Sequence, residues 1–388
     1  MTRRKRTKLI VLLTGAALLI IAGVAWAATT FPDVDPGDTH ADAISWAAEN
    51  GIVNGYANGN FGPYDPILRG QAATMFQNYD TNLGTSTCKE CHNDTTMLTG
   101  KAAAWGESLH GTGVVFLEDG GEANCAGCHS GGAFSAMVAA GLEPNKLTAG
   151  DPNPTRQDCR ACHKIHTSYT DADWALETVA PVALYATPGN TYDGGAGNLC
   201  AKCHQVRRTF PAAVDGKVAV TNRFGPHHGP QSAMLLGIAG AGATVGTPFI
   251  HYTAVADTCV TCHMGPITDV DAPGDDDDAG EADERPTAGH TFLPSPANCA
   301  PCHADLEDFD VGGTQTEVQA MLDELKAALV TKGLLTAEGA IVPGSYPEAQ
   351  AAALWNWIYV SKEDKSLGVH NPPYTKALLQ SGIDALAG

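Results

Sequence analysis

Apolar residues recur at helical spacing in three stretches near the C-terminal end of the chain. Residues 347–360 and 374–386 predict two helices, and residues 317–332 predict a longer one. In this longer stretch one face of the helix collects the apolar side chains: Val318, Met321, Leu322, Leu325, Leu329 and Val330. The amphipathic pattern predicts that these helices pack against the region before them.

The apolar pattern at the start of the chain is continuous rather than periodic. A basic start is followed by the apolar run 9–24 and by the small-x-small cleavage sequence Ala25-Trp26-Ala27. We therefore interpret residues 1–27 as a secretion signal peptide. The alternative is an uncleaved membrane anchor, because the run is nearly long enough to span a bilayer.

Short helical patterns and turn signals alternate between residues 28 and 80. Residues 41–50 predict an amphipathic helix that ends at the following glycine, and residues 70–79 predict a second helix. Asn58-Gly59 and Pro63 mark tight turns between them. The segment contains no cysteine.

The order of these residues resembles a single S-layer homology repeat. The matching pieces are Phe31-Pro-Asp33-Val34, Ala43-Ile44-Ser45-Trp46-Ala47, Gly51-Ile52-Val53-Asn54-Gly55-Tyr56, Gly59-Asn60-Phe61-Gly62-Pro63 and Arg69-Gly70-Gln71. The resemblance implies binding to a cell-wall polymer or to the S-layer. In that family three repeats usually form one unit, so a single copy implies trimerisation or pairing with another chain.

All twelve cysteines fall into six copies of C-x-x-C-H. The cysteine pairs are Cys88/Cys91, Cys125/Cys128, Cys159/Cys162, Cys200/Cys203, Cys259/Cys262 and Cys299/Cys302, and the motifs end at His92, His129, His163, His204, His263 and His303. This spacing attaches haem c covalently, and the adjoining histidine takes one axial position on the iron. A zinc knuckle or a redox dithiol could explain one motif, but not six. The sequence therefore predicts six covalently attached haem c groups, with iron as the metal.

The spacing of the motifs bears on the fold. Their first cysteines are separated by 37, 34, 41, 59 and 40 residues, which is too irregular for a solenoid repeat. Because so little chain serves each haem, we expect a mainly α fold with much irregular loop, wrapped around the haems. The predicted organisation is a signal peptide (1–27), a small helical S-layer homology module (28–80), a hexahaem domain (81–312) and C-terminal helices packing over the last haems (313–388).

Each haem iron needs a second axial ligand or stays open to substrate. The chain has fourteen histidines; six end the motifs, and His40 occupies a position where the S-layer repeat often carries histidine or an aromatic residue. Seven candidates remain: His110, His166, His227, His228, His251, His290 and His370. One from the adjacent pair plus the other five would complete bis-histidine ligation. Methionine is the alternative ligand, with Met97, Met137, Met234 and Met264 as candidates.

His166 shows what this ligand count implies. It follows His163 by three residues, so the two cannot bind opposite faces of one porphyrin. We therefore expect His166 to reach a neighbouring haem, which would bring two haems close together.

The haem-bearing part resembles the multihaem cytochrome superfamily that includes cytochrome c nitrite reductase and c-552 proteins. The matching pieces are Trp105-x-x-Ser108-x-His110, His227-His228-Gly-Pro-Gln231, Cys259-Val-Thr-Cys262-His263-Met264, Gly289-His290-Thr291-Phe292 and Gly368-Val369-His370-Asn371-Pro372. The resemblance implies that the histidines outside the motif are distal ligands, and it favours His227 over His228. Nitrite reductases of this type carry a lysine in place of one motif histidine, and no motif here does.

We therefore expect an electron-transfer protein rather than an enzyme. The alternative is a reductase of nitrite, hydroxylamine or sulfur oxyanions with one five-coordinate haem; a wall-bound structural protein is a third class. Expected partners are redox proteins or extracellular electron acceptors and the cell-wall polymer or S-layer. Self-association into an oligomer or filament stays open.

The charge of the chain further limits the classes of partner that it can bind. The net charge of −20 repels nucleic acid and anionic lipid. Nine carboxylates fall within residues 269–284 without the spacing of an EF-hand, so a solvated loop is favoured over a calcium site. Secretion signal, haem motifs and S-layer repeat together predict a secreted protein at the cell wall or cell surface.

Overall fold

The computed structural model describes residues 31–79, 96–227, 229–242, 246–265, 289–304 and 306–387. The chain divides into two units, Met1–Asn93 and Asp94–Gly388. Four predicted features lie outside the described residues: the signal peptide, the first motif (Cys88, Cys91 and His92), His228 and the acidic run 269–284.

The first unit contains the two predicted helices, α2 (Ala41–Glu49) and α3 (Arg69–Tyr79), and both are confirmed. Its small core buries apolar side chains from the N-terminal segment, from α2 and from the following turn: Phe31, Ala41, Ile44, Ile52 and Val53. The Asp33 carboxylate accepts backbone N–H bonds from Phe61 and Gly62, each at 2.8 Å. These bonds tie the loop between the helices to the segment before α2.

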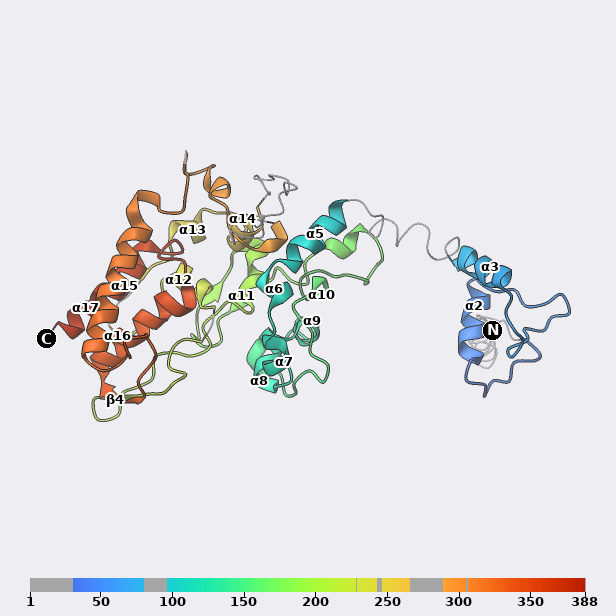
Figure 1. The fold of residues 1–388 in the computed structure, drawn as a ribbon, viewed down its shortest axis with the longest axis horizontal. Helices are drawn as coiled ribbons and strands as arrows, with labels where there is room; N and C mark the ends of the chain where they lie inside the picture. The colour runs from blue at the N-terminus through green and yellow to red at the C-terminus, as the bar shows by residue number, and fades with distance from the viewer. Residues whose placement is uncertain are drawn as a thin grey trace, which may run out of the picture. The chain divides into compact units, whose positions relative to one another are not determined.

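The second unit is mainly helical, with irregular loops and few strands, as the sequence predicts (Figure 1). Its first helices are short: α5 (Thr96–Gly106), α6 (Leu109–Thr112), α7 (Val115–Asp119), α8 (Ala123–His129), α9 (Gly131–Ala139), α10 (Cys159–Cys162), α11 (Asn198–Ala201), α12 (Gln231–Leu236), α13 (Ile250–Thr253) and α14 (Cys259–His263). Single 3₁₀ turns lie between these helices or follow the last of them: Pro144–Lys146, Asp171–Trp174, Gly195–Gly197, Gly289–Thr291, Pro296–Cys299 and Val311–Gly313.

The described strands form two antiparallel pairs. Strand β1 (Val182–Ala183) pairs with β2 (Thr191–Tyr192), and Val182 lies opposite Tyr192. Strand β3 (Lys217–Val220) pairs with β4 (Gly344–Pro347), which comes much later in the chain. The second pair links the motif region to the C-terminal helices.

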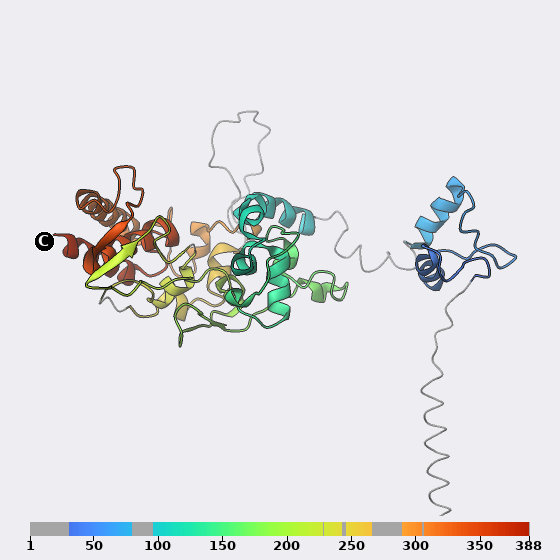
Figure 2. The same ribbon diagram turned by 90° about the horizontal axis from the view of Figure 1, so that it is seen from below.

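The three C-terminal helices are longer and pack on one another. Helix α16 (Glu348–Ile358) contacts both α15 (Thr314–Thr331) and α17 (Pro372–Leu386), and the orange-to-red helices gather beside strand β3 in Figure 2. The predicted apolar face of α15 is confirmed: four of its six residues are buried and two are half-buried. Helix α16 continues into a π-helical turn, η8 (Tyr359–Asp364), where the sequence predicts an end at residue 360.

The C-terminal helices share their core with the motif region. Val218, Phe224 and Met234 belong to the same buried cluster as Leu325 and Trp355. No helix among the described residues is long and apolar enough to cross a membrane.

Candidate functional site

Four histidines that end motifs each face a histidine from elsewhere in the chain. The ring centres are 6.2 Å apart in His110–His204, His163–His290 and His251–His303, and 6.4 Å apart in His263–His370. The motif histidines in these four pairs are, in the same order, those of the fourth, third, sixth and fifth motifs. Each of them has a different partner.

Hydrogen bonds hold five of these imidazoles through their Nδ1 atoms. Three of the acceptors are backbone carbonyls: Trp174 O for His163 at 2.6 Å, Val369 O for His251 at 2.8 Å and Phe292 O for His263 at 2.9 Å. The other two are side-chain oxygens: Gln231 Oε1 for His204 at 3.1 Å and Asp364 Oδ1 for His370 at 2.7 Å.

These acceptors determine the protonation of the rings. A carbonyl or carboxylate oxygen can only accept, so Nδ1 must carry the proton. The Nε2 lone pair of a neutral ring is then left for a metal, which is the usual arrangement of a histidine ligand and its outer hydrogen bond. Burial lowers the pKa of His110 and of His290 to about 4 in each case, which keeps both rings neutral at pH 7.

The ring spacing provides a test of fit for haem. An imidazole nitrogen lies about 2 Å from a metal ion that it binds and roughly 1 Å from its own ring centre, so two rings across one iron are ~6 Å apart. The four observed pairs agree with this distance. Their interplanar angles run from 28° to 84°, and rotation of each ring about a metal–nitrogen bond would accommodate this range. The residues at these four motifs fit a bis-histidine haem.

The second motif has a different neighbour. Arg207 Nη1 lies 3.2 Å from His227 Nε2 and 3.9 Å from Cys125 Sγ, and Arg207 Nη2 donates to the Asn124 carbonyl at 2.6 Å. Arg207 thus holds His227 beside the motif that ends at His129. Since this contact uses Nε2, ligation by His227 would require Arg207 to give up that hydrogen bond.

His166 stacks on Tyr169, with ring centres 5.6 Å apart. Both residues have positive φ angles, 63° for His166 and 57° for Tyr169. His227 also has a positive φ, of 70°. Such backbone conformations are uncommon outside glycine and cluster at functional sites.

The motifs also lie close to one another. Cys203 Sγ of the fourth motif is 3.9 Å from the Gly127 carbonyl of the second, and Cys162 and Cys203 pack on one apolar cluster. Asn298, beside the sixth motif, donates to the Cys262 carbonyl of the fifth at 3.4 Å. Burial, followed by the neighbouring thiols of the fifth and sixth motifs, raises the pKa of Cys262 to about 11.

The cysteines of the motifs differ in how far the protein covers them. None of the ten described cysteines forms a disulfide; eight are half-buried, whereas Cys159 and Cys302 are exposed. Cys302 lies beyond the 3₁₀ turn Pro296–Cys299, and its backbone N–H donates to the Cys299 carbonyl at 3.0 Å. The sixth motif forms a tight turn, and the wrapping of the chain around the haems stays a prediction. The role of Cys302 in haem attachment also stays a prediction.

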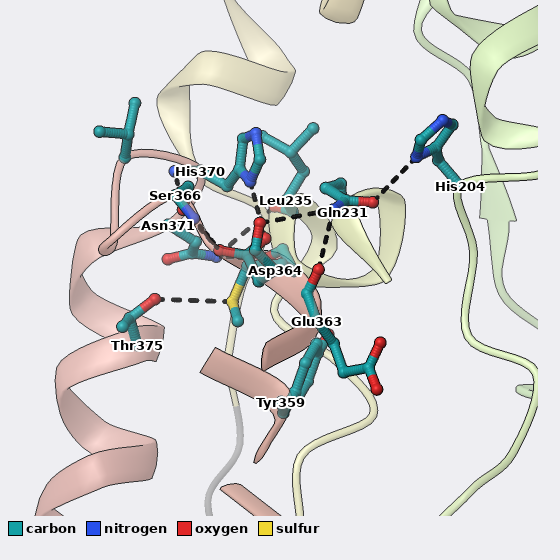
Figure 3. Close-up of polar contacts among 12 residues, drawn as sticks. His204, Gln231, Leu235, Tyr359, Glu363, Asp364, Ser366, His370, Asn371 and Thr375 are labelled. Carbon is teal, nitrogen blue, oxygen red and sulfur yellow. Dashed lines mark hydrogen bonds and ion pairs between the residues drawn. The ribbon is translucent and has the colours of Figure 1, made fainter. Parts of the chain in front are cut away.

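Some residues that hold the histidines were not identified from sequence. Figure 3 shows Asp364 beside His370, and Gln231 between His204 and the Glu363 carbonyl. The carbonyls of Trp174, Phe292 and Val369 also carry no sequence signal, because any residue supplies one. No group of three or more His, Cys, Asp or Glu side chains among the described residues could hold a bare metal ion.

Comparison with known proteins places one segment in a family. Residues 30–73 match the S-layer homology domain. S-layer homology domains typically bind cell-wall polymers, so this match indicates an association with the cell surface or cell wall. No curated protein matches the chain, and no solved structure does.

Proposed function

We propose that this protein is a cell-surface electron-transfer protein that carries six covalently attached haem c groups. The observation that carries the proposal is the set of four histidine pairs, each joining one motif histidine to one distant histidine at 6.2–6.4 Å. When bound, haem c supplies a one-electron Fe(III)/Fe(II) couple. The cysteines of each motif would hold the porphyrin, and the paired histidines would hold its iron.

The residues around the pairs favour electron transfer over catalysis. A reductase needs one open iron position and nearby acids or bases that deliver protons to a bound substrate. His110, His290, His251 and His370 would close that position at four motifs. The short contacts between neighbouring motifs would keep their cofactors within reach of one another, as a conduit requires.

Intact mass and electron paramagnetic resonance test this proposal. The secreted protein should exceed the mass of the 28–388 polypeptide by six haem groups, and its oxidised spectrum should contain low-spin haem only. A His370→Ala variant should convert one haem to high spin, whereas the matched His40→Ala variant should change none. Fewer than six haems, or a high-spin haem that shifts with nitrite, would contradict the proposal and favour the reductase.

We propose further that the S-layer homology domain attaches the protein to the cell wall. Deletion of residues 28–80 should release the protein into the medium with an unchanged visible spectrum, because these residues contain no cysteine. Retention of the shortened protein at the wall would show that another part of the chain is the anchor.

A further inference from the structure

Asp364 differs chemically from the other groups that hold the imidazole rings. Four of the five Nδ1 acceptors are neutral: three backbone carbonyls and the Gln231 side-chain amide. The fifth is the Asp364 carboxylate, whose Oδ1 lies 2.7 Å from His370 Nδ1. One of the four histidine pairs therefore has a negative charge next to it.

The Asp364 carboxylate is buried and held on both sides. Its side chain has no solvent exposure. The hydroxyl and the backbone N–H of Ser366 both donate to Oδ2, while Oδ1 faces His370 (Figure 3). Among the described residues, His370 is the one basic side chain that pairs with Asp364. The charge is therefore directed at the ring and is little screened by water.

We propose that Asp364 is a positioning residue that gives the haem between His263 and His370 the lowest reduction potential of the four paired sites. This inference rests on the proposed function. Oxidised haem carries one more positive charge than reduced haem, so a buried carboxylate stabilises the oxidised form. A strong hydrogen bond from Nδ1 also makes Nε2 a more basic ligand, which acts in the same direction.

Gln231 provides the neutral counterpart within the same network. Its Oε1 accepts from His204 at 3.1 Å, and its Nε2 donates to the Glu363 carbonyl at 3.1 Å. The same Nε2 lies 3.4 Å from the Asp364 carbonyl. One network thus holds His204 with an amide and His370 with a carboxylate, so the two sites differ in the charge of the acceptor.

An Asp364→Asn variant of the haem-loaded protein tests the inference, because asparagine keeps an oxygen acceptor for His370 and removes the charge. Potentials are measured by a spectroelectrochemical titration, and the relevant haem is the one that His370→Ala converts to high spin. We expect its reduction equilibrium to shift at least about tenfold towards the reduced form, which is ~59 mV for a one-electron couple. All haems should remain low-spin.

The matched control is Asp310→Asn. Asp310 accepts from the Gln315 backbone and from the Thr316 hydroxyl, each at 2.6 Å, and it pairs with no histidine among the described residues. The control removes the same charge, so it should leave the potential of that haem nearly unchanged. Equal shifts in the two variants, or no shift in Asp364→Asn, would overturn the inference.

A second variant tests the sign of the effect and applies if Asp364→Asn does not fold. Ser366→Ala removes a donor to the carboxylate, which leaves more charge for His370, so the potential should fall. A rise or no change would overturn the inference. If the potential rose or stayed unchanged while all six haems remained low-spin, the inference would fail and the proposed function would stand. If the unmodified protein lacked haem at the fifth motif, the proposed function itself would fail.

Discussion

The C-terminal helices and the motif region before them are stabilised in different ways. Among the residues that the structure describes, the core around α15, α16 and α17 buries 24 apolar residues, whereas the two clusters confined to the motif region bury six and four. Helices α15 and α17 are 18 and 15 residues long, but α10, α11 and α13 have only four residues each. Isolated helices this short are not stable in water.

The motif region buries less apolar area than the C-terminal helices do. The C-terminal helices enclose an apolar interior made of their own side chains together with β3 and α12. The histidine pairs and cysteines of the motif region are mostly half-buried, and the side chains of this region alone supply little apolar area. Under the proposed function, the porphyrins would supply the missing apolar area. The two regions should therefore respond differently to loss of haem and to loss of a core side chain.

The largest expected effect is the response to losing the attachment cysteines. If alanine replaces all twelve motif cysteines, the motif region should lose its protease resistance, because its small clusters cannot hold it together. Residues 314–387 should resist for longer, since their core is formed by side chains. Limited proteolysis followed by mass spectrometry measures both. A cleavage pattern identical to that of the unmodified protein would show that the motif region is stable without haem.

Replacement of a core side chain should destabilise the C-terminal helices. Leu325 is completely buried in the C-terminal core, so Leu325→Ala should lower the free energy of unfolding by about 2–5 kcal/mol. Chemical denaturation followed by far-ultraviolet circular dichroism measures this change, and the visible haem spectrum should persist. Leu117→Ala is the matched control: Leu117 is 67% exposed, and the change should be below about 0.5 kcal/mol. Equal losses of unfolding free energy in the two variants would contradict the expectation that burial of Leu325 stabilises the core.

Substitution of Asn371, which links the two regions, should lower the stability less than substitution of Leu325. The Asn371 side chain caps α17 by accepting from Tyr374 N at 3.2 Å, and it donates to the carbonyls of Met234 at 3.1 Å and Thr247 at 3.0 Å. Asn371→Ala removes the cap and leaves the carbonyls of Met234 and Thr247 with one partner fewer, which should lower the free energy of unfolding by about 1–3 kcal/mol. Asn371→Asp is the matched variant, because it keeps the cap and loses the two donated bonds.

Thermal unfolding separates the two contributions. Asn371→Asp should recover part of the stability if the cap matters, and none if the bonds to the motif region carry the whole effect. An Asn371→Ala protein as stable as the original would mean that this residue does not join the regions.

The two regions also differ in how far sequence predicts them. The period of apolar residues predicts α15 and its buried face, because this helix packs on neighbours through side chains alone. In the motif region, spacing identifies the cysteines and the histidine candidates but not the pairs: His110 faces His204, and His263 faces His370, across long stretches of chain. Local patterns carry no information on such contacts.

The role of Asp364 was equally hidden from sequence. It lies in the π-helical turn η8 that follows α16, beyond the predicted end of that helix. Its side chain is fully buried, whereas an isolated aspartate is usually a surface residue. Only the fold brings it to His370.

The smallest expected effect concerns the backbone just before the fifth motif. Asp257 and Thr258 have positive φ angles of 55° and 39°, an unfavourable conformation that the surroundings must hold. The buried Tyr192 hydroxyl donates to Thr258 Oγ1 at 2.9 Å, and Thr258 Oγ1 donates to the Gly194 carbonyl at 3.0 Å. Tyr192→Phe removes the first bond and keeps the ring, so unfolding should become easier by about 1 kcal/mol.

The matched control is Tyr169→Phe, because the Tyr169 side chain is 52% exposed and the loss of its hydroxyl should change the free energy of unfolding little. Hydrogen exchange of the backbone amides at positions 258 and 259 gives the local readout. If haem attachment fixes this segment, the increase in exchange after Tyr192→Phe should be small in the loaded protein and large in the protein without motif cysteines. An equal increase in both would mean that the Tyr192 hydrogen bond, rather than the attached cofactor, holds the backbone in front of the fifth motif.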